Sequence, residues 1–175
     1  MLIGGPGTGK STVLKELQNR NYYCMPEVSR EVIQQAQQKG IEQLFLTDPL
    51  LFSKMLLEGR ERQYIEAERN DSKVAFFDRG LPDVHAYMEY ANDTYPKYFL
   101  EKSIQYKYDH VFLFKPWREI YISDNERYES FEESMKIDAF LQSAYLELDY
   151  LIVDVPFGSI DQRVNFILNW LNLNT

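Results

Sequence analysis

Eight residues near the start of the chain have the types and spacing that bind phosphate groups. They fit the pattern G-x-x-x-x-G-K-[ST] at every fixed position. Glycines let backbone N–H groups point inward around an anion, a lysine adds a positive charge at the β- and γ-phosphates, and a serine hydroxyl is a hard ligand for Mg²⁺. We therefore expect a nucleoside triphosphate here, with Thr12 also in contact. The phosphate loop consists of Gly4, Gly5, Pro6, Gly7, Thr8, Gly9, Lys10 and Ser11.

The sequence around the phosphate loop argues against a chance match in a glycine-rich turn. Apolar residues 1–3 precede it, and Val13, Leu14 and Leu17 follow it at the spacing of one helical face. A helix that begins directly after the loop points the positive end of its dipole at the phosphates. A strand over residues 1–3 is unusually short, so we expect either a clipped strand or a natural sequence that starts before Met1.

A second acidic group follows the apolar run 74–77, which we predict to be a buried strand ending at Asp78. The Asp78 carboxylate could hold Mg²⁺, directly or through water, opposite Ser11, or it could cap the next turn. We favour the magnesium role, because a protein with this loop needs such a group. Arg79 comes next, and it could bind a substrate or neutralise Asp78.

Glu27 lies just after another predicted strand, over residues 22–25. In the strand order usual for kinases with a phosphate loop, 2-3-1-4-5, Glu27 would lie one strand farther from the loop than Asp78. It would then face the crevice where the acceptor of a phosphoryl group binds. There it could accept a proton from a hydroxyl group or position that group. The alternative is a first-turn glutamate favoured by the helix dipole. Arg30 could pair with Glu27 or contact the substrate.

The polar segment 117–129 follows an apolar run at 111–114. Kinases of this type place a lid at this point, and lid arginines neutralise the charge that develops on the transferred phosphate. Arg127 is the first candidate, for nucleotide binding and for catalysis, and Arg118 is the second. The alternative is a solvated charged turn.

The elements that would position these residues alternate between short apolar runs and longer helical segments. This pattern predicts an α/β protein with a mainly parallel sheet, and the length suits one domain over residues 1–175. Further strands are expected at 111–114 and 150–155, and helices at 10–19, 28–39, 49–69, 82–90, 96–106, 131–148 and from 160 onward.

The composition and charge of the chain argue against nucleic acid and membranes as binding partners. The formal net charge is −8, so the chain as a whole is a poor electrostatic match for nucleic acid or an anionic membrane. No apolar run approaches the ~18 residues of a membrane span, and no signal-peptide pattern opens the chain. The single cysteine, Cys24, fits a reducing, cytoplasmic location and is expected to be a small buried hydrophobe, not a nucleophile. His85 and His110 have no partners at metal-ligand spacing.

Several segments in order carry a family resemblance. They are 4–12, Pro-Glu-Val-Ser-Arg at 26–30, Phe-Asp-Arg-Gly at 77–80, Pro-Trp-Arg at 116–118, Asp-Asn-Glu-Arg at 124–127 and Val-Pro at 155–156. The chain resembles the NadR-like family of predicted AAA-type P-loop ATPases, which is related to the kinase domain that phosphorylates ribosylnicotinamide and, more distantly, to deoxynucleoside kinases. The resemblance implies a P-loop NTPase fold with a five-stranded parallel sheet flanked by helices. It also implies ATP and Mg²⁺ as ligands, and acceptor-side roles for Glu27 and for Asp78 with Arg79.

These features favour an ATP-dependent phosphotransferase that acts on a nucleoside-like or other small hydroxyl acceptor, with GTP left open as the donor. The alternative is an ATPase or GTPase-type regulatory protein that acts on a macromolecular partner. Against it, Asp78 is followed by Arg79 and not by the glutamate that many motor-type ATPases use to activate water, and no Asn-Lys-x-Asp segment is present. A non-catalytic binding module would be free to lose Lys10 and Ser11, which are intact.

Overall fold

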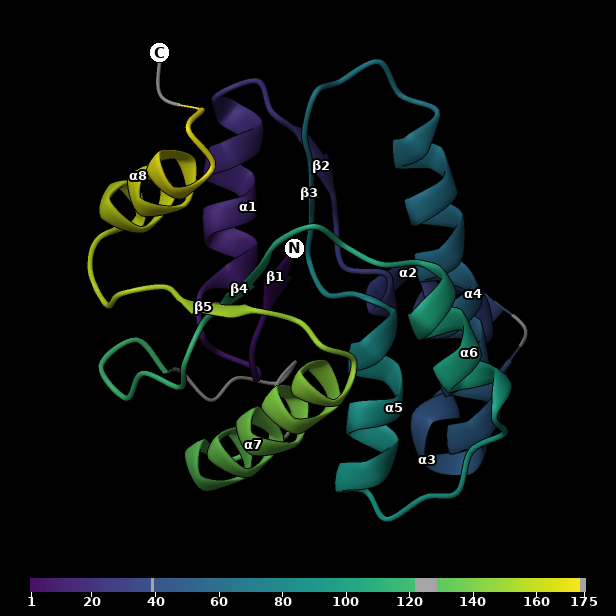
Figure 1. Ribbon diagram of the computed structural model, residues 1–175. Coiled ribbons are helices and arrows are strands. Elements are labelled where there is room, and N and C mark those ends of the chain that lie inside the picture. The colour runs from purple at the N-terminus through teal and green to yellow at the C-terminus, as the bar shows by residue number, and fades with distance from the viewer. Residues whose placement is uncertain (39, 122–128, 174–175) are drawn as a thin grey trace.

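The computed structural model describes residues 1–38, 40–121 and 129–173, and it alternates strands with helices as predicted (Figure 1). The strands are β1 (Leu2–Ile3), β2 (Tyr23–Met25), β3 (Ala75–Phe77), β4 (Val111–Leu113) and β5 (Ile152–Asp154). The helices are α1 (Lys10–Asn19), α2 (Ser29–Gln38), α3 (Leu44–Thr47), α4 (Pro49–Glu68), α5 (Leu81–Tyr90), α6 (Tyr98–Gln105), α7 (Phe131–Glu147) and α8 (Ile160–Trp170). The short helix α3 has no counterpart in the sequence prediction.

Local sequence signals set the helix starts. The Asp48 carboxylate accepts a hydrogen bond from the Leu51 N–H at 3.0 Å, which caps α4. At α8, the Ser159 hydroxyl accepts from the Gln162 N–H at 3.2 Å, and the Gln162 side chain accepts from the Ser159 N–H at 2.8 Å. This reciprocal cap fixes the first turn of α8. Among the described helices, none has the length and apolar character to cross a membrane.

All strand pairs are parallel, but the strands form two sheets and not one. The first has the order β1-β4-β5, and the second pairs β2 with β3. One bridge joins them between Leu2 and Asp78, where the Arg79 N–H donates to the Leu2 carbonyl at 3.0 Å. The prediction of a continuous five-stranded sheet in the order 2-3-1-4-5 is therefore wrong. The reason is the two-residue length of β1, in which alternate residues face the two neighbours. The carbonyls of Met1 and Ile3 accept from β4 and from Phe114 just after it, and Leu2 faces β3 and forms the bridge.

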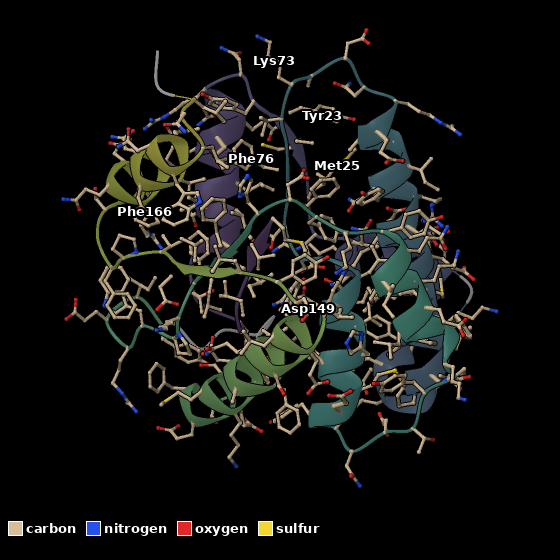
Figure 2. The ribbon with its side chains drawn as sticks, in the orientation of Figure 1. Tyr23, Met25, Lys73, Phe76, Asp149 and Phe166 are labelled. Carbon is tan, nitrogen blue, oxygen red and sulfur yellow. The ribbon has the colours of Figure 1, made fainter. Side chains whose placement is uncertain are left out.

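Helices cover both faces of the sheets (Figure 1). Successive strand residues point to opposite faces, so β3 directs Phe76 and Phe77 into different apolar clusters. Phe76 packs with residues of α1 and α8, and Phe77 packs with residues of α4, α5 and α7. Figure 2 shows Phe76 on the α1 side and Met25 on the α4 side. Every residue of β1 and β4 is fully buried, which explains why these strands read as continuous apolar runs.

The parallel arrangement brings three polar segments to one edge. Because the strands run in the same direction, the phosphate loop after β1, Glu27 after β2 and Asp78 after β3 all leave the carboxyl ends of neighbouring strands. In open α/β sheets this edge is where ligands bind. The fold therefore gathers the predicted site residues from distant parts of the sequence.

Candidate functional site

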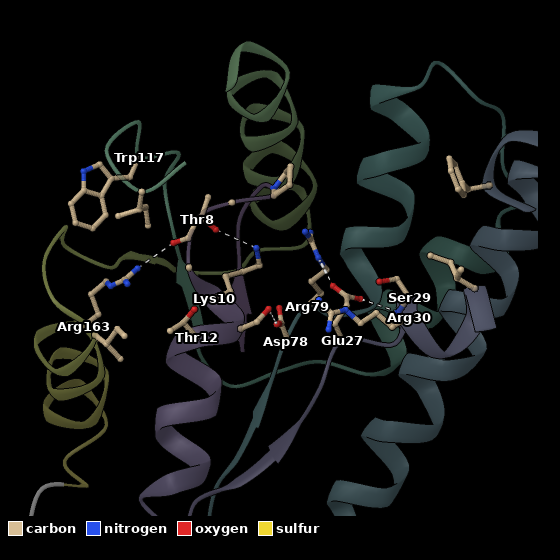
Figure 3. A pocket seen from close by; sticks show the side chains of 18 of the residues that line it. Thr8, Lys10, Thr12, Glu27, Ser29, Arg30, Asp78, Arg79, Trp117 and Arg163 are labelled. Atoms are coloured by element: carbon tan, nitrogen blue, oxygen red, sulfur yellow. Dashed lines mark hydrogen bonds and ion pairs between the residues drawn. The ribbon is translucent and has the colours of Figure 1, made fainter. Parts of the chain in front are cut away.

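A cavity of about 1590 Å³ opens at this edge. Typical small-molecule sites have volumes of roughly 300–1,000 Å³, so there is room for two ligands. Figure 3 shows Lys10 between two ends of the cavity, with Trp117 and Arg163 on one side and Glu27 and Arg30 on the other. The predicted residues that line it are Pro6, Gly7, Thr8, Gly9, Lys10, Ser11, Thr12, Glu27, Arg30, Asp78 and Arg79.

The backbone of the phosphate loop requires glycine at particular points. A Cβ atom at Gly4 would lie 2.3 Å from the carbonyl oxygen of Phe114, so a side chain there would push the loop away from the end of β4. Gly9 has a φ of +85°, a left-handed conformation that glycine adopts without strain, and α1 begins directly after it. These constraints explain two of the fixed glycines of the motif in this chain.

Lys10 folds back over the loop that precedes it. Its Nζ donates to the Gly5 carbonyl at 2.8 Å and to the Thr8 hydroxyl at 3.2 Å. Burial is the main cause that lowers the pKa of Lys10 to about 8, and the positive charge of Arg79 adds to the effect. A desolvated ammonium held by neutral oxygens gains strongly when an anion arrives, because it then has a partner of opposite charge.

Ser11 and Asp78, the two residues predicted to hold Mg²⁺, lie in contact with each other. The Ser11 hydroxyl donates to Asp78 Oδ2 at 2.7 Å. The other oxygen, Asp78 Oδ1, is buried and has no hydrogen-bond partner among the described residues. An orphaned carboxylate oxygen beside a serine hydroxyl fits Mg²⁺. The described residues contain no cluster of three or more His, Cys, Asp or Glu that could hold a metal, but Mg²⁺ often takes only one or two carboxylates plus substrate phosphates.

Glu27 is fixed by two arginines. Its Oε2 lies 2.5 Å from Arg79 Nε and its Oε1 lies 3.2 Å from Arg60 Nη2, while the Ser29 N–H donates to Oε1 at 3.3 Å. Burial acts to raise the pKa of Glu27, but the charges of Arg79 and Arg60 outweigh it, so the pKa is lowered. The side chain is 19% exposed. Glu27 is therefore an ionised carboxylate with a set orientation at the cavity wall.

Arg60 is a site residue that the sequence reasoning missed. It comes from the middle of α4, is 4% exposed, and donates from Nη1 to the Gly80 carbonyl at 2.7 Å as well as pairing with Glu27. Its neighbour Gly59 lets α4 approach the segment after β2, because a Cβ there would lie 2.4 Å from Val28 Cγ1. The sequence signal for a buried Arg60 was the glycine beside it inside a long helix. This signal is weak, because arginines are common on helix surfaces.

Arg79 pairs with Glu27 and also with Asp83, whose Oδ1 lies 3.3 Å from Arg79 Nη1. Among the described residues, it makes no ion pair with Asp78. Its guanidinium lies 5.2 Å from the centre of the Tyr87 ring. Arg79 has a φ of +71°, which is uncommon for a residue with a side chain, and these contacts on three sides hold it there.

The other predicted arginines differ in position. Arg30 lies in α2 and lines the cavity near Glu27 (Figure 3). Arg118 does not line the cavity. It pairs with Glu132 at 2.7 Å, lies 4.4 Å from the centre of the Phe131 ring, and is 72% exposed. Arg127 lies outside the described residues.

Arg163 is a second residue that the sequence reasoning missed. It belongs to α8 and donates from Nη1 to the Thr8 carbonyl at 3.2 Å. It lines the cavity at the end away from Glu27. The sequence offered no signal for it, because an arginine near the end of a helix is usually solvated. Here Arg163 is buried instead, as is its neighbour Val164.

Solved kinases have a similar fold. A deoxyadenosine kinase from M. mycoides aligns with a TM-score of 0.74 and 19% identity, covering 98% of this chain and 97% of that chain. Thymidylate kinase from Candida albicans aligns with a TM-score of 0.67 and 16% identity, covering 98% and 89%. At these identities the likeness establishes the fold, which is the α/β P-loop fold of nucleoside and nucleotide kinases.

Sequence comparison gives a family assignment. No curated protein matches the chain significantly. A family model described as an AAA domain matches residues 1–163, which include the phosphate loop, Glu27, Asp78 and Arg163. The match spans nearly the whole chain, in agreement with the fold. The chain therefore belongs to the AAA domain family.

Proposed function

We propose that the chain is a Mg²⁺-dependent phosphotransferase that moves the γ-phosphoryl group of ATP to a hydroxyl group of a small, nucleoside-like acceptor. One observation carries this proposal. Glu27 is an ionised carboxylate held by Arg60 and Arg79 in the same cavity as Lys10. A carboxylate at this point repels an acceptor phosphate, but it can orient a hydroxyl group and take its proton.

On the donor side, the phosphate loop and Lys10 would hold the β- and γ-phosphates. Lys10 would exchange its bonds to the Gly5 carbonyl and the Thr8 hydroxyl for phosphate oxygens. Ser11 and Asp78 would hold Mg²⁺, which supplies charge neutralisation at the phosphates. GTP would fit the same phosphate contacts and stays an alternative donor.

On the acceptor side, the proposed step uses Glu27, Arg79 and Arg30. The acceptor hydroxyl oxygen forms a bond to the γ-phosphorus, the bond from that phosphorus to the β,γ-bridging oxygen breaks, and the hydroxyl proton passes to the Glu27 carboxylate. ADP leaves with the bridging oxygen. Phosphoryl transfer needs positioning and charge stabilisation, so the fixed orientation of Glu27 matters together with its capacity to take the proton.

We also propose that the segment 117–129 acts as a lid over the transferred phosphate. Arg118 would have to leave Glu132 to reach the transferred phosphate, and this costs little because the pair is strongly exposed. Arg127 is proposed for the same role from its place in the sequence. The order of segments 26–30, 77–80 and 155–156 supports a kinship with the NadR-like branch, in which case the acceptor would be a nucleoside or a related cofactor precursor.

The proposal is tested by measuring ADP formation with Mg²⁺-ATP and a panel of nucleosides, nucleoside monophosphates and cofactor precursors. We expect turnover to depend on a nucleoside or precursor with a free hydroxyl. Lys10→Ala serves as the control that removes donor binding. ADP formation at the same rate without any acceptor would contradict the kinase proposal and support an ATPase.

A further inference from the structure

Arg163 carries a buried charge without a carboxylate partner. The residue is 6% exposed, and it makes no ion pair among the described residues. Its Nε is buried and lacks a hydrogen-bond partner there. Burial lowers the pKa of Arg163, and no neighbouring acidic group opposes that effect. Arg60 also has a buried Nε without a partner, but its charge and that of Arg79 are compensated by the carboxylate of Glu27.

The guanidinium of Arg163 is pressed against the phosphate loop. Besides its 3.2 Å bond to the Thr8 carbonyl, Nη1 would lie only 2.6 Å from a Cβ atom at Gly9. The centres of the Phe114 and Trp117 rings lie 5.9 and 5.7 Å from Arg163 Cζ. The side chain is thus held in one place by packing, so little of its conformational freedom remains to be lost when a ligand binds.

A buried guanidinium in this state is costly unless an anion compensates it. Arginine has five N–H donors in a planar fork, and the described contacts of Arg163 use one of them, on a neutral carbonyl. The cavity next to it is where the proposed donor nucleotide would extend from Lys10, on the side away from Glu27 (Figure 3). An incoming polyphosphate would supply both the missing charge and the missing acceptors.

We propose that Arg163 is a binding residue for the phosphate chain of the donor nucleotide. The inference rests on the proposed use of the phosphate loop for a nucleoside triphosphate. It assigns to α8 a direct part in donor binding. It also explains why a cationic side chain occupies the buried face of that helix.

The test measures ligand affinity and stability for the full chain and three variants. Arg163→Met keeps the length and removes the charge, Arg163→Lys keeps the charge, and Arg20→Met removes an arginine that pairs with Glu16 and Asp161 away from the cavity. The ligands are Mg²⁺-ATP and inorganic tripolyphosphate, which has no base or sugar. Binding is measured by calorimetry, and melting temperature is measured without ligand.

For Arg163→Met we expect affinity for both ligands to fall about tenfold or more, since a charged hydrogen bond is lost. We expect its melting temperature without ligand to stay within about 4 °C of the wild type or to rise, because an uncompensated charge is removed. Arg163→Lys should lose less affinity than Arg163→Met, and Arg20→Met should bind as the wild type does.

Three outcomes would overturn the inference. Unchanged tripolyphosphate affinity in Arg163→Met, with weaker ATP binding, would assign Arg163 to the base or sugar. Unchanged affinity for both ligands would leave it a packing residue. If Arg163→Met does not fold, the affinities of Arg163→Lys test the inference. A loss of about a hundredfold for both ligands in Arg163→Lys would show that Arg163 acts by holding the loop geometry and not through its charge. Failure of the wild type to bind either ligand would instead overturn the proposed function itself.

Discussion

The Ser11 hydroxyl donates a hydrogen bond to the Asp78 carboxylate at 2.7 Å across 67 positions of sequence. The contact joins the start of α1 to the end of β3, next to the single bridge that connects the two sheets. The proposed metal ligands therefore lie where the two sheets are joined. Asp78 Oδ1 has no partner there among the described residues, so the pair has unused ligand capacity.

Asp78→Asn should weaken Mg²⁺-ATP binding by at least about tenfold and nearly abolish transfer, because an amide oxygen is a poorer ligand than a carboxylate. Its free energy of unfolding without ligand should change by less than about 1 kcal/mol, since the amide keeps the shape and the Ser11 contact. Asp154→Asn is the matched control at the end of another strand, where the carboxylate is 55% exposed. Equal Mg²⁺ dependence in Asp78→Asn and the wild type would contradict the metal assignment.

Lys10 predicts a pH effect on donor binding. Burial lowers its pKa to about 8, below the ordinary 10.5, so part of the population is neutral near that pH. Phosphate binding favours the charged form, so the protein should take up about half a proton on binding Mg²⁺-ATP at about pH 8 and close to none at about pH 7. Affinity should fall as the pH rises through this range. Calorimetry in buffers of different ionisation enthalpy measures the uptake, and equal uptake at both pH values would contradict it.

Glu27→Gln should abolish most transfer while leaving ATP affinity within about twofold, because Glu27 lies on the acceptor side. It should also cost about 3 kcal/mol of stability, since it leaves Arg60 and Arg79 as buried charges without their partner. Adding Arg60→Met should restore part of the stability but none of the transfer. Urea unfolding and turnover assays separate the two effects.

Glu61→Gln is the control for that experiment. Glu61 is also 19% exposed and also pairs with a cation, Lys102, but it does not line the cavity. Transfer should therefore survive in Glu61→Gln. If Glu27→Gln transfers at the wild-type rate, Glu27 is a structural residue at the start of α2.

Cys24 should react slowly. Burial raises its pKa from 9.0 to about 11, which reduces the thiolate fraction at about pH 8 by roughly a hundredfold. Alkylation by iodoacetamide should be correspondingly slower in the folded protein than in urea, and Cys24→Ser should keep full transfer. Equal alkylation rates in the folded protein and in urea would show that the Cys24 thiol is accessible and that its pKa is not raised.

Local patterns account for what could be predicted from the sequence. The phosphate loop, the cap at Asp48 and the paired placement of Ser11 and Asp78 all follow from short motifs and from the parallel alternation of strands and helices. The fold class follows from the same alternation. Strand and helix existence depends on neighbours within a few residues, which the sequence displays directly.

Long-range packing accounts for what could not be predicted. Arg60 reaches the site from the middle of α4 and Arg163 from the first turn of α8, and their roles depend on which helix face meets the cavity. The split into two sheets depends on how many residues of β1 are free to pair with β3. The pair of Arg79 with Asp83 is a local contact, four positions along the chain, that the two predicted choices for Arg79 did not include.

The most direct test of the central claim follows the label from γ-labelled ATP with Mg²⁺ and a nucleoside acceptor identified in the panel. For the wild type and Glu61→Gln, the account predicts labelled phosphorylated acceptor in equal amount to ADP. For Glu27→Gln it predicts ATP binding with little labelled acceptor. Label released as inorganic phosphate at a rate that does not depend on the acceptor, or label on the acceptor in Glu27→Gln as in the wild type, would contradict it.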